Sequence, residues 1–412
     1  MNRRTFLKIA GMGSLAFAAS CSPEKDKTLF SSVKAPADTV AGKATWYAST
    51  CRECPAGCGV LAKNREGRIV KLEGNPVHPV NKGRLCMRGQ AALQGVYHPD
   101  RLKTPQIKKN GQWHPLSFSE AESILKAKYA DVRQKGSHGA GMLTETVSEG
   151  MLHLFTMMMQ ELGAPAPRVF EPFAYESLKA ANALTLGVDG LVSYRMQHAD
   201  CLVSFGADFL ETWLSPVEYA WKFKTMHAFR NHNKHLFFQV SPYQSLTGAN
   251  ADHWLACRPG SEAAVALGLI REVLDKGKGN HLPAGLRTYL VQASSAYTKD
   301  RVAADSGIPT AQFTQLTTRL MAANRPLVLG GGTGASDTNG LQAQLAANLL
   351  NLILDPQLRL VDANNRHRVE QAAERREVIQ FFDSLRYDKA ELLLLNNVNP
   401  LYALPTSKGI RE

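Results

Sequence analysis

The stretch Cys51-Arg52-Glu53-Cys54-Pro55-Ala56-Gly57-Cys58 places three cysteines on one short loop, in the pattern C-x2-C-x3-C. A fourth cysteine, Cys86, stands after a further 27 residues. A [4Fe–4S] cluster needs four thiolates, one for each iron, and a tight loop can supply three of them. Pro55 fixes its own φ angle and Gly57 lets the backbone approach closely, which suits such a loop. The pattern therefore predicts that Cys51, Cys54, Cys58 and Cys86 hold one [4Fe–4S] cluster.

The residues between the third and fourth cysteines have the pattern of a β-hairpin. Val60 and Leu61 begin one strand, residues 64–67 turn, and residues 69–72 form the return strand. Gly74-Asn75-Pro76 then ends the hairpin. This hairpin is expected to bring Cys86 back toward the loop.

Zinc and disulfide bonds are the rival uses of these cysteines. Zinc sites more often pair two short C-x2-C knuckles, and the second knuckle is missing here. Exported proteins often carry disulfides, but the spacing favours the cluster. Cys201 and Cys257 stand in apolar, strand-like contexts and are expected to be plain buried thiols.

The first residues are typical of an export signal. Asn2-Arg3-Arg4-Thr5-Phe6-Leu7-Lys8 matches the twin-arginine pattern, and the apolar stretch 9–19 is too short and too rich in glycine and alanine for a spanning helix. Twin-arginine signals direct folded proteins to export. Ala18-Ala19-Ser20-Cys21 resembles a lipoprotein box with Cys21 as the lipidated residue, and ordinary cleavage nearby is the alternative. Residues 22–43 are then a polar linker.

The composition is that of a globular protein, with 44% apolar and 20% charged residues among 412. The net charge is +12, but no long basic run is interleaved with aromatic residues, which argues against a nucleic-acid partner. An anionic lipid surface or an acidic redox partner is the better match for this charge.

Short apolar runs alternate with helical stretches along the rest of the chain. The runs 201–205, 236–240, 327–329 and 392–395 predict parallel strands of an α/β layer. Ser119 to Lys135 is predicted as a helix capped by Ser117 or Ser119, and Ser261 to Leu274 as another. The expected inward faces are Ala121, Ile124, Leu125 and Tyr129 in the first helix and Ala264, Leu267, Ile270 and Leu274 in the second.

Ligands of parallel sheets bind at the carboxyl ends of the strands. Gly206, Asp208 and Ser241 fall at such ends and are candidate cofactor-binding residues. Residues 330–334 form a Gly-Gly-Gly-Thr-Gly run that either approaches a phosphate or only makes tight turns. His78, His98 and His114 are expected in loops or at the surface rather than as ligands.

The cysteine pattern, continued by Met87-Arg88-Gly89, resembles the molybdopterin oxidoreductase family. Four later segments keep the family's order and extend the resemblance from about residue 45 to the end of the chain. They are Tyr97-His98-Pro99-Asp100-Arg101-Leu102, Trp113-His114-Pro115-Leu116-Ser117-Phe118, Arg258-Pro259-Gly260-Ser261-Glu262-Ala263-Ala264 and Asn399-Pro400-Leu401-Tyr402-Ala403-Leu404-Pro405.

The resemblance is to the bis-molybdopterin guanine dinucleotide, DMSO reductase-like group. It implies a small N-terminal iron–sulfur β-rich domain followed by parallel-sheet α/β domains, with a [4Fe–4S] cluster and molybdopterin guanine dinucleotide as cofactors. Arg88 stands where the family has a Lys or Arg between cluster and pterin, a cation that would stabilise added electron density. The alternative for Arg88 is a surface arginine paired with a carboxylate. Gly260 and Glu262 are assigned to cofactor binding by the same resemblance.

The segment 170–177 departs from the family. Active members place a Cys, selenocysteine, Ser or Asp ligand of molybdenum before a helix, and by an ungapped count Ala174 occupies that position here. Alanine cannot bind a metal, although a shift of two or three residues would offer Glu176 or Ser177. The chain also ends at Glu412, soon after the Asn-Pro segment, where the family continues, so we expect a split subunit or a fragment.

Residues 204–210 and 246–252 resemble a particular branch, the molybdopterin-like subunit of alternative complex III and of the related periplasmic quinone reductase complex. The four retained cysteines favour the quinone reductase branch. The expected domains are a signal (1–21), a linker (22–43), a [4Fe–4S] domain (44–103) and an incomplete α/β region (104–412).

The resemblance thus implies an iron–sulfur electron-transfer subunit on the periplasmic side of the cytoplasmic membrane. Its partners would be iron–sulfur, cytochrome c and quinone-interacting membrane subunits. Catalysis at molybdenum on a small substrate and a purely structural scaffold are the two alternatives.

Overall fold

The computed structural model describes residues 40, 42–135, 139–229, 234–331 and 339–405. The predicted signal with Cys21, most of the linker, and residues 332–334 of the glycine run lie outside the described residues. The chain divides into two units, one of residues up to 47 with 62–71, the other of residues 48–61 with 72 onward. All four candidate cluster cysteines belong to the second unit.

The N-terminal strands form a small sheet. Strands β1 (Thr45–Thr50), β2 (Gly59–Arg65) and β3 (Arg68–Gly74) lie in the order β1-β2-β3. The predicted hairpin is confirmed, with Glu66 and Gly67 turning at positive φ angles between its strands. Helix α2 (Met87–Val96) follows, and Cys86 precedes its first residue.

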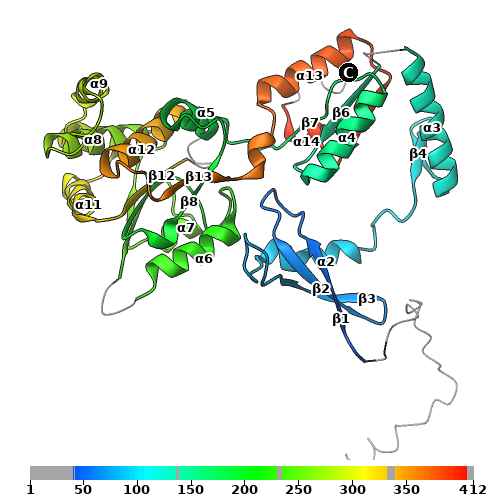
Figure 1. Ribbon diagram of the computed structural model, residues 1–412, viewed down its shortest axis with the longest axis horizontal. Coiled ribbons are helices and arrows are strands. Elements are labelled where there is room, and N and C mark those ends of the chain that lie inside the picture. The colour runs from blue at the N-terminus through cyan, green and yellow to red at the C-terminus, as the bar shows by residue number, and fades with distance from the viewer. Residues whose placement is uncertain (1–39, 41, 136–138, 230–233, 332–338, 406–412) are drawn as a thin grey trace, which may run out of the picture. The chain divides into compact units, whose positions relative to one another are not determined.

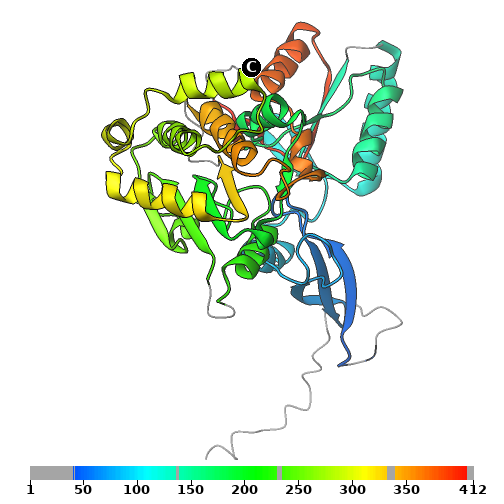
Figure 2. The ribbon, with the colours of Figure 1, turned by 60° about the vertical axis from the view of Figure 1, so that its left-hand side comes forward.

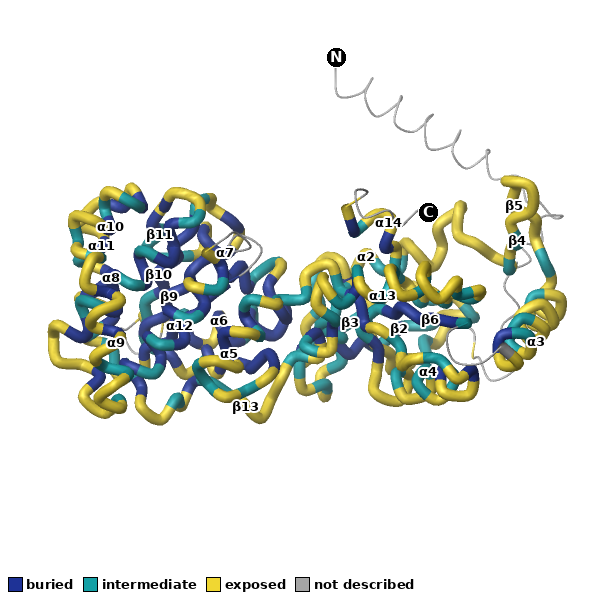
Figure 3. Tube along the Cα trace, turned by 90° about the horizontal axis from the view of Figure 1, so that it is seen from above, coloured by how far each residue is buried: buried dark blue, intermediate teal, exposed yellow. Residues whose placement is uncertain are grey.

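The central element of the larger unit is a four-stranded parallel sheet. Strands β9 (Cys201–Phe205), β10 (Leu236–Ser241), β11 (His253–Ala256) and β12 (Pro326–Gly330) lie in the order β11-β10-β9-β12. Figure 1 labels β12 of this sheet. Three of these strands coincide with predicted apolar runs. Their residues are buried on both faces, as the dark blue tube shows in Figure 3, which is typical of parallel sheets.

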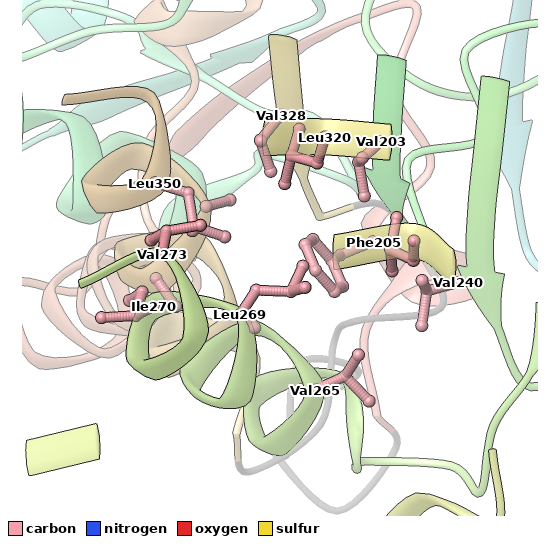
Figure 4. Packing of buried hydrophobic residues seen from close by; sticks show 14 of the residues in the cluster. Val203, Phe205, Val240, Val265, Leu269, Ile270, Val273, Leu320, Val328 and Leu350 are labelled. Carbon is pink, nitrogen blue, oxygen red and sulfur yellow. The ribbon is translucent and has the colours of Figure 1, made fainter. Parts of the chain in front are cut away.

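Two hydrophobic cores lie on the two faces of this sheet. Side chains alternate along β9, so Val203 and Phe205 face one core and Leu202 faces the other. The first core is covered by the helices gathered beside the sheet in Figure 2. Figure 4 shows Phe205 and Val240 of the sheet against Leu269 and Val265 of one of these helices. The helices on this side are α8 (Glu262–Asp275), α9 (Ala284–Ser294), α10 (Lys299–Ser306), α11 (Thr310–Ala322) and α12 (Gly340–Leu354).

The second core involves α5 (Glu176–Leu186), α6 (Pro216–His227) and the antiparallel pair β8 (Val192–Tyr194) and β13 (Val361–Arg366). A one-turn 3-10 helix, η1 (Met196–His198), and the short α7 (Leu246–Ala249) complete this side, and η3 (Arg368–Gln371) follows β13.

A separate parallel sheet joins early and late parts of the chain. Strand β6 (Ala140–Thr144) pairs with β7 (Arg168–Val169) and with β14 (Leu392–Asn396), in the order β14-β6-β7. The predicted strand at 392–395 therefore forms, but in this sheet rather than beside the other three predicted strands. The elements that accompany it are α3 (Phe118–Lys135), α4 (Glu149–Glu161), α13 (Arg375–Tyr387) and α14 (Pro400–Ala403), with the hairpin β4 (Gln106–Lys109) and β5 (Gln112–Pro115) preceding α3.

The two predicted helices form, but their buried faces agree with the prediction only in part. Helix α3 is capped by Ser117, whose Oγ accepts from Glu120 N at 3.2 Å. Ile124 and Leu125 are nevertheless 46% and 47% exposed, because α3 buries mainly Val132 against β6 and α4.

In α8 Ile270 and Leu274 are buried as predicted, but Ala264 and Leu267 are only half-buried. The buried face is centred on Val265, Leu269 and Val273. This helix packs against both the sheet and α12, so its buried face is wider than a single amphipathic stripe. The fold is mixed α/β, with a β-rich N-terminal part and parallel sheets, as predicted. Among the described residues, no helix combines the length and the apolar character needed to cross a membrane.

Candidate iron–sulfur centre and adjoining cavity

The cysteine loop closes on itself between β1 and β2. Cys51 N donates to Cys58 O at 2.8 Å, and Gly57 N, at a φ of 61°, reaches Cys54 O at 3.5 Å. These contacts hold the ends of the loop together, so its three cysteines stay on one short turn.

Asn81 connects this loop to the segment that carries Cys86. Its side chain accepts from Gly59 N at 3.0 Å and donates to Gly59 O at 2.9 Å and to Arg84 O at 2.6 Å. The side chain is fully buried. Gly74 lets the chain pass close by, since a Cβ there would lie 2.6 Å from Arg84 N. Asn81 thus fixes the fourth cysteine relative to the other three.

The four thiols lie in one electrostatic neighbourhood. Burial raises the pKa values of Cys51 and Cys54 and raises the pKa of Cys58 to about 12. Cys86 adds to the raised pKa of each of these three thiols. Thiolates crowded in this way are stable only beside positive charge, which iron would supply.

The donor set of this site suits a [4Fe–4S] cluster. Such a cluster needs four thiolates, one for each iron. The loop supplies Cys51, Cys54 and Cys58, and Cys86 follows the segment that Asn81 ties to the loop.

Arg88 lies in the first turn of α2, two residues after Cys86. Its charge lowers the pKa of Cys54 against the effect of burial. The side chain is exposed, and its Nη2 atom donates to the backbone oxygen of Glu211 at 3.4 Å. Arg88 is thus placed to act on the cluster electrostatically, and the contact that it makes is with a backbone oxygen.

A cavity of about 1110 Å³ opens beside the cluster loop. Its wall is formed by Cys51 and Cys54, by the segments that follow β6 and β7, and by the start of α6. Residues 365–369 and 397–403 complete it. The cavity is therefore shared between the cluster loop and the carboxyl ends of the sheet that contains β6, where ligands of parallel sheets bind.

The cavity carries polar groups with no protein partner. Thr146 Oγ1 and Ser215 Oγ are buried, line the cavity and have no hydrogen-bond partner in the part of the chain that the structure describes. Burial raises the pKa of Glu171, although Thr146 N donates to its Oε1 at 3.1 Å. Buried hydroxyls are normally bonded, so these groups are expected to meet water or a polar ligand.

The residues considered as a molybdenum ligand do not belong to this cavity wall. Ala174 packs against the second core, and Glu176 accepts from Arg375 N at 2.7 Å at the start of α13. Ser177 is half-buried in the first turn of α5. Within the described residues, the segment 170–177 contributes only Phe170, Glu171 and Pro172 to the cavity. None of the three predicted ligand positions therefore fits a metal there.

The predicted cofactor residues gather elsewhere, at the carboxyl edge of the central sheet. Gly206 N donates to Val240 O at 3.0 Å, and Ser241 ends β10 beside it. Asp208 is 2% exposed and accepts from Tyr243 Oη at 2.6 Å and from Ser245 Oγ. Its carboxylate is thus engaged within the protein.

Gly260 and Glu262 lie at the start of α8, and Glu262 is 2% exposed. Gly330 ends β12 and Gly331 follows it, and a Cβ on either would collide with the Gln344 side chain. Close packing against α12 therefore accounts for these two glycines. None of the five predicted cofactor residues is among those that line the cavity.

Sequence reasoning missed several buried polar residues around the centre. Asn81 gave no signal because its role depends on contacts across the loop. Glu218 and Lys222 stand at the i,i+4 spacing of a helical ion pair, which was the available signal. Tyr219 and His367 were also missed, and their side chains lie 3.0 Å apart at Oη and Nε2.

Two family models match the chain. The molybdopterin oxidoreductase Fe4S4 domain matches residues 44–98, and the molybdopterin oxidoreductase domain matches residues 101–340. The chain belongs to the molybdopterin oxidoreductase family. The first match supports a [4Fe–4S] cluster on this chain, and the second makes a molybdopterin cofactor an option that must be tested.

Curated relatives cover most of the chain. The menaquinone reductase molybdopterin-binding-like subunit of Nitratidesulfovibrio vulgaris is 27% identical over 388 residues, or 90% of this chain and 55% of that protein. The molybdopterin-containing thiosulfate reductase subunit of Salmonella typhimurium is 25% identical over 82% of this chain and 44% of its own length. The chain thus spans about half the length of these relatives.

The fold resembles that of acetylene hydratase from Pelobacter acetylenicus. The TM-score is 0.58 at 18% identity, over 74% of this chain and 43% of that enzyme. At this identity the likeness concerns the fold alone. The chain is therefore a molybdopterin oxidoreductase-like protein with an iron–sulfur domain, related to a quinone reductase subunit.

Proposed function

We propose that the protein is an electron-transfer subunit that works through one [4Fe–4S] cluster. When bound, such a cluster takes up and releases single electrons. The observation that carries the proposal is a contrast within one site. The four cysteines are gathered by the loop and Asn81, whereas Ala174, Glu176 and Ser177 contribute nothing to the cavity beside them.

The chain's own residues support this role in two ways. Buried Cys58 and Asn81 keep water away from one side of the cluster position, while exposed Arg88 places a cation on another side. The cation favours added electron density near Cys54. Exposed residues around α2 leave room for a redox partner to approach.

The partners are proposed from the relative in Nitratidesulfovibrio vulgaris, which is named as a subunit of a menaquinone reductase. By analogy, this chain would work in a quinone-linked respiratory complex with iron–sulfur, cytochrome c and membrane subunits. The net charge of +12 supports docking to an acidic partner or an anionic lipid surface.

The location is proposed from the N-terminal sequence. The twin-arginine pattern supports export to the periplasmic side of the cytoplasmic membrane, and Cys21 supports a lipid anchor there. We also keep the domain division proposed from the sequence, with the [4Fe–4S] domain at 44–103 and the α/β region from 104.

Metal analysis of the full chain, purified without air, tests the proposal. Four irons per chain without molybdenum or tungsten, and a cluster that accepts an electron on titration, are expected. Stoichiometric molybdenum or tungsten would contradict it, and zinc in place of iron would remove the redox role. A cluster that cannot be reduced would favour the scaffold alternative.

Catalysis at molybdenum remains the second candidate because of the cavity. Thr146 and Ser215 present buried hydroxyls without protein partners to a volume of about 1110 Å³, which is enough for a sizeable polar ligand. Glu171 and Glu218 are the other oxygen donors on that wall. Recovery of a pterin from the denatured protein would favour this candidate.

A further inference from the structure

A buried ion pair lies behind the wall of the cavity. Glu218 and Lys222 are one turn apart on α6, and each side chain is 8% exposed. Lys222 Nζ donates to Glu218 Oε1 at 2.5 Å, Ser193 Oγ at 3.0 Å and Tyr194 O at 2.9 Å. Its three hydrogens are thus all used. Ser193 Oγ also lies 3.1 Å from Glu218 Oε1, so the carboxylate is held in place from two sides.

Stability alone is a poor explanation for this pair. Both charges are largely removed from water, and Tyr194 and Tyr219 are fully buried beside them. Moving two charges out of water costs several kcal/mol per ion, and well-packed apolar residues often replace such pairs without loss. The Glu218–Lys222 pair is therefore expected to have a function that depends on its charges.

The pair has a fixed orientation toward the cluster position. Glu218 lines the cavity together with Cys51 and Cys54, and Lys222 is not among the lining residues. Trp221 holds α6 against the segment before Cys86, since its Nε1 donates to Val80 O at 3.0 Å. Lys82 Nζ also lies 4.1 Å from the centre of the Trp221 ring. The negative end of the pair thus faces the cluster side, and the positive end lies behind it.

We propose that the Glu218–Lys222 pair sets the reduction potential of the cluster by holding a fixed negative charge toward it. This inference rests on the proposed electron-transfer function. Reduction adds one electron to the cluster and breaks no bond, so the carboxylate opposes it through space and lowers the potential. Glu218 is a positioning residue in this scheme, because it is not a ligand of the cluster.

Burial strengthens the effect of the Glu218 carboxylate, whose side chain is 8% exposed. Salt and water screen a buried charge much less than an exposed one.

The test is a redox titration of the cluster in the full chain, followed by electron paramagnetic resonance, with dithionite supplying the electron. The variants are Glu218→Gln and the double variant Glu218→Gln/Lys222→Met. Both remove the negative charge that faces the cluster. If Glu218→Gln fails to fold because Lys222 is left as an unpaired buried cation, the double variant, which lacks that cation, supplies the measurement. Glu272→Gln is the matched control, since Glu272 pairs with Lys299 on the opposite side of the central sheet.

The midpoint potential is expected to rise in both variants and to stay unchanged in Glu272→Gln. The rise should be smaller in the double variant, because the cation behind the carboxylate is lost as well. An unchanged or lower potential in variants that keep four irons would overturn the inference. If the unaltered protein holds no reducible cluster, the proposed function itself fails, so the two failures are distinguishable.

Discussion

Asn81 shows how much one side chain contributes to the cysteine centre. It makes hydrogen bonds to Gly59 and Arg84, on both sides of the path from Cys58 to Cys86. Replacement by alanine removes three bonds and leaves buried backbone groups without partners. Asn81→Ala is expected to lower the free energy of unfolding by about 2–4 kcal/mol and to reduce the iron content. Chemical denaturation and iron analysis measure the two effects.

Asn250 provides the control for this variant. Its side chain is exposed and donates to Leu246 O at 2.9 Å. Asn250→Ala should change stability by less than about 1 kcal/mol and leave the iron content unaltered. Equal iron contents in the two variants would contradict the role given to Asn81.

His367 predicts a specific dependence of stability on pH. Burial lowers its pKa from 6.5 to about 4, so the native ring is neutral at neutral pH. Below pH 6.5 the unfolded chain binds a proton that the native protein does not bind. Stability should therefore fall from pH 6.5 to about 4, by on the order of 3 kcal/mol. His367→Gln should remove this part of the dependence in urea titrations; parallel curves for both proteins would refute the assignment.

The segment 170–177 shows the limit of prediction for individual residues. An ungapped count placed Ala174, Glu176 and Ser177 near the ligand position, and sequence alone could not choose among them. The choice depends on how α5 packs: Ala174 contacts the core and Glu176 binds the start of α13. These are contacts between distant parts of the chain, which no local pattern records.

At the scale of elements, the strands were predictable and the buried helix faces were not. The apolar runs at 201–205, 236–240 and 327–329 became β9, β10 and β12, because strands buried on both faces are apolar throughout. The run at 392–395 also became a strand, yet its sheet depends on pairing with β6. Ile124 and Leu125 are exposed on α3, contrary to the prediction. Periodicity shows that a helix has an apolar side, but it does not show which element that side packs against.

The packing of α5 against α12 depends on a buried polar network. Asn348 Nδ2 donates to Asn182 Oδ1 at 3.0 Å and to Thr185 Oγ1 at 2.9 Å, and Asn182 Nδ2 donates to Gly190 O at 2.8 Å. Asn348→Ala leaves Asn182 Oδ1 without this donor and should cost about 2–4 kcal/mol. Thermal or denaturant unfolding measures the loss.

Gln342 is the matched control on the same helix. It is exposed on α12, so Gln342→Ala should shift the free energy of unfolding by no more than about 0.5 kcal/mol. Similar losses in both variants would indicate a general effect on helix α12 rather than on the network.

At the scale of the whole molecule, the proposed periplasmic location can be tested separately from the proposed cluster. Replacing Arg3 and Arg4 with lysine should keep the protein in the cytoplasm with its iron intact, because the signal and the cluster loop are independent segments. Cys21→Ser should permit export but release the protein from the membrane fraction. Fractionation followed by immunoblotting and iron analysis distinguishes these outcomes, and export of the double-lysine variant would count against the twin-arginine route.

The pairing of β6 with β14 also governs when the protein can fold. Asn396 Nδ2 bonds Thr144 Oγ1 across 252 residues of sequence. At about 5–20 residues per second, a ribosome needs about 13–50 s to make that interval. Strand β6 must wait unpaired on this edge for that time, and the cavity wall at 397–403 forms only at the end of it. This site can therefore be completed only after residues 397–403 have been made, and a chaperone that shields the waiting strand would raise the yield of folded chain.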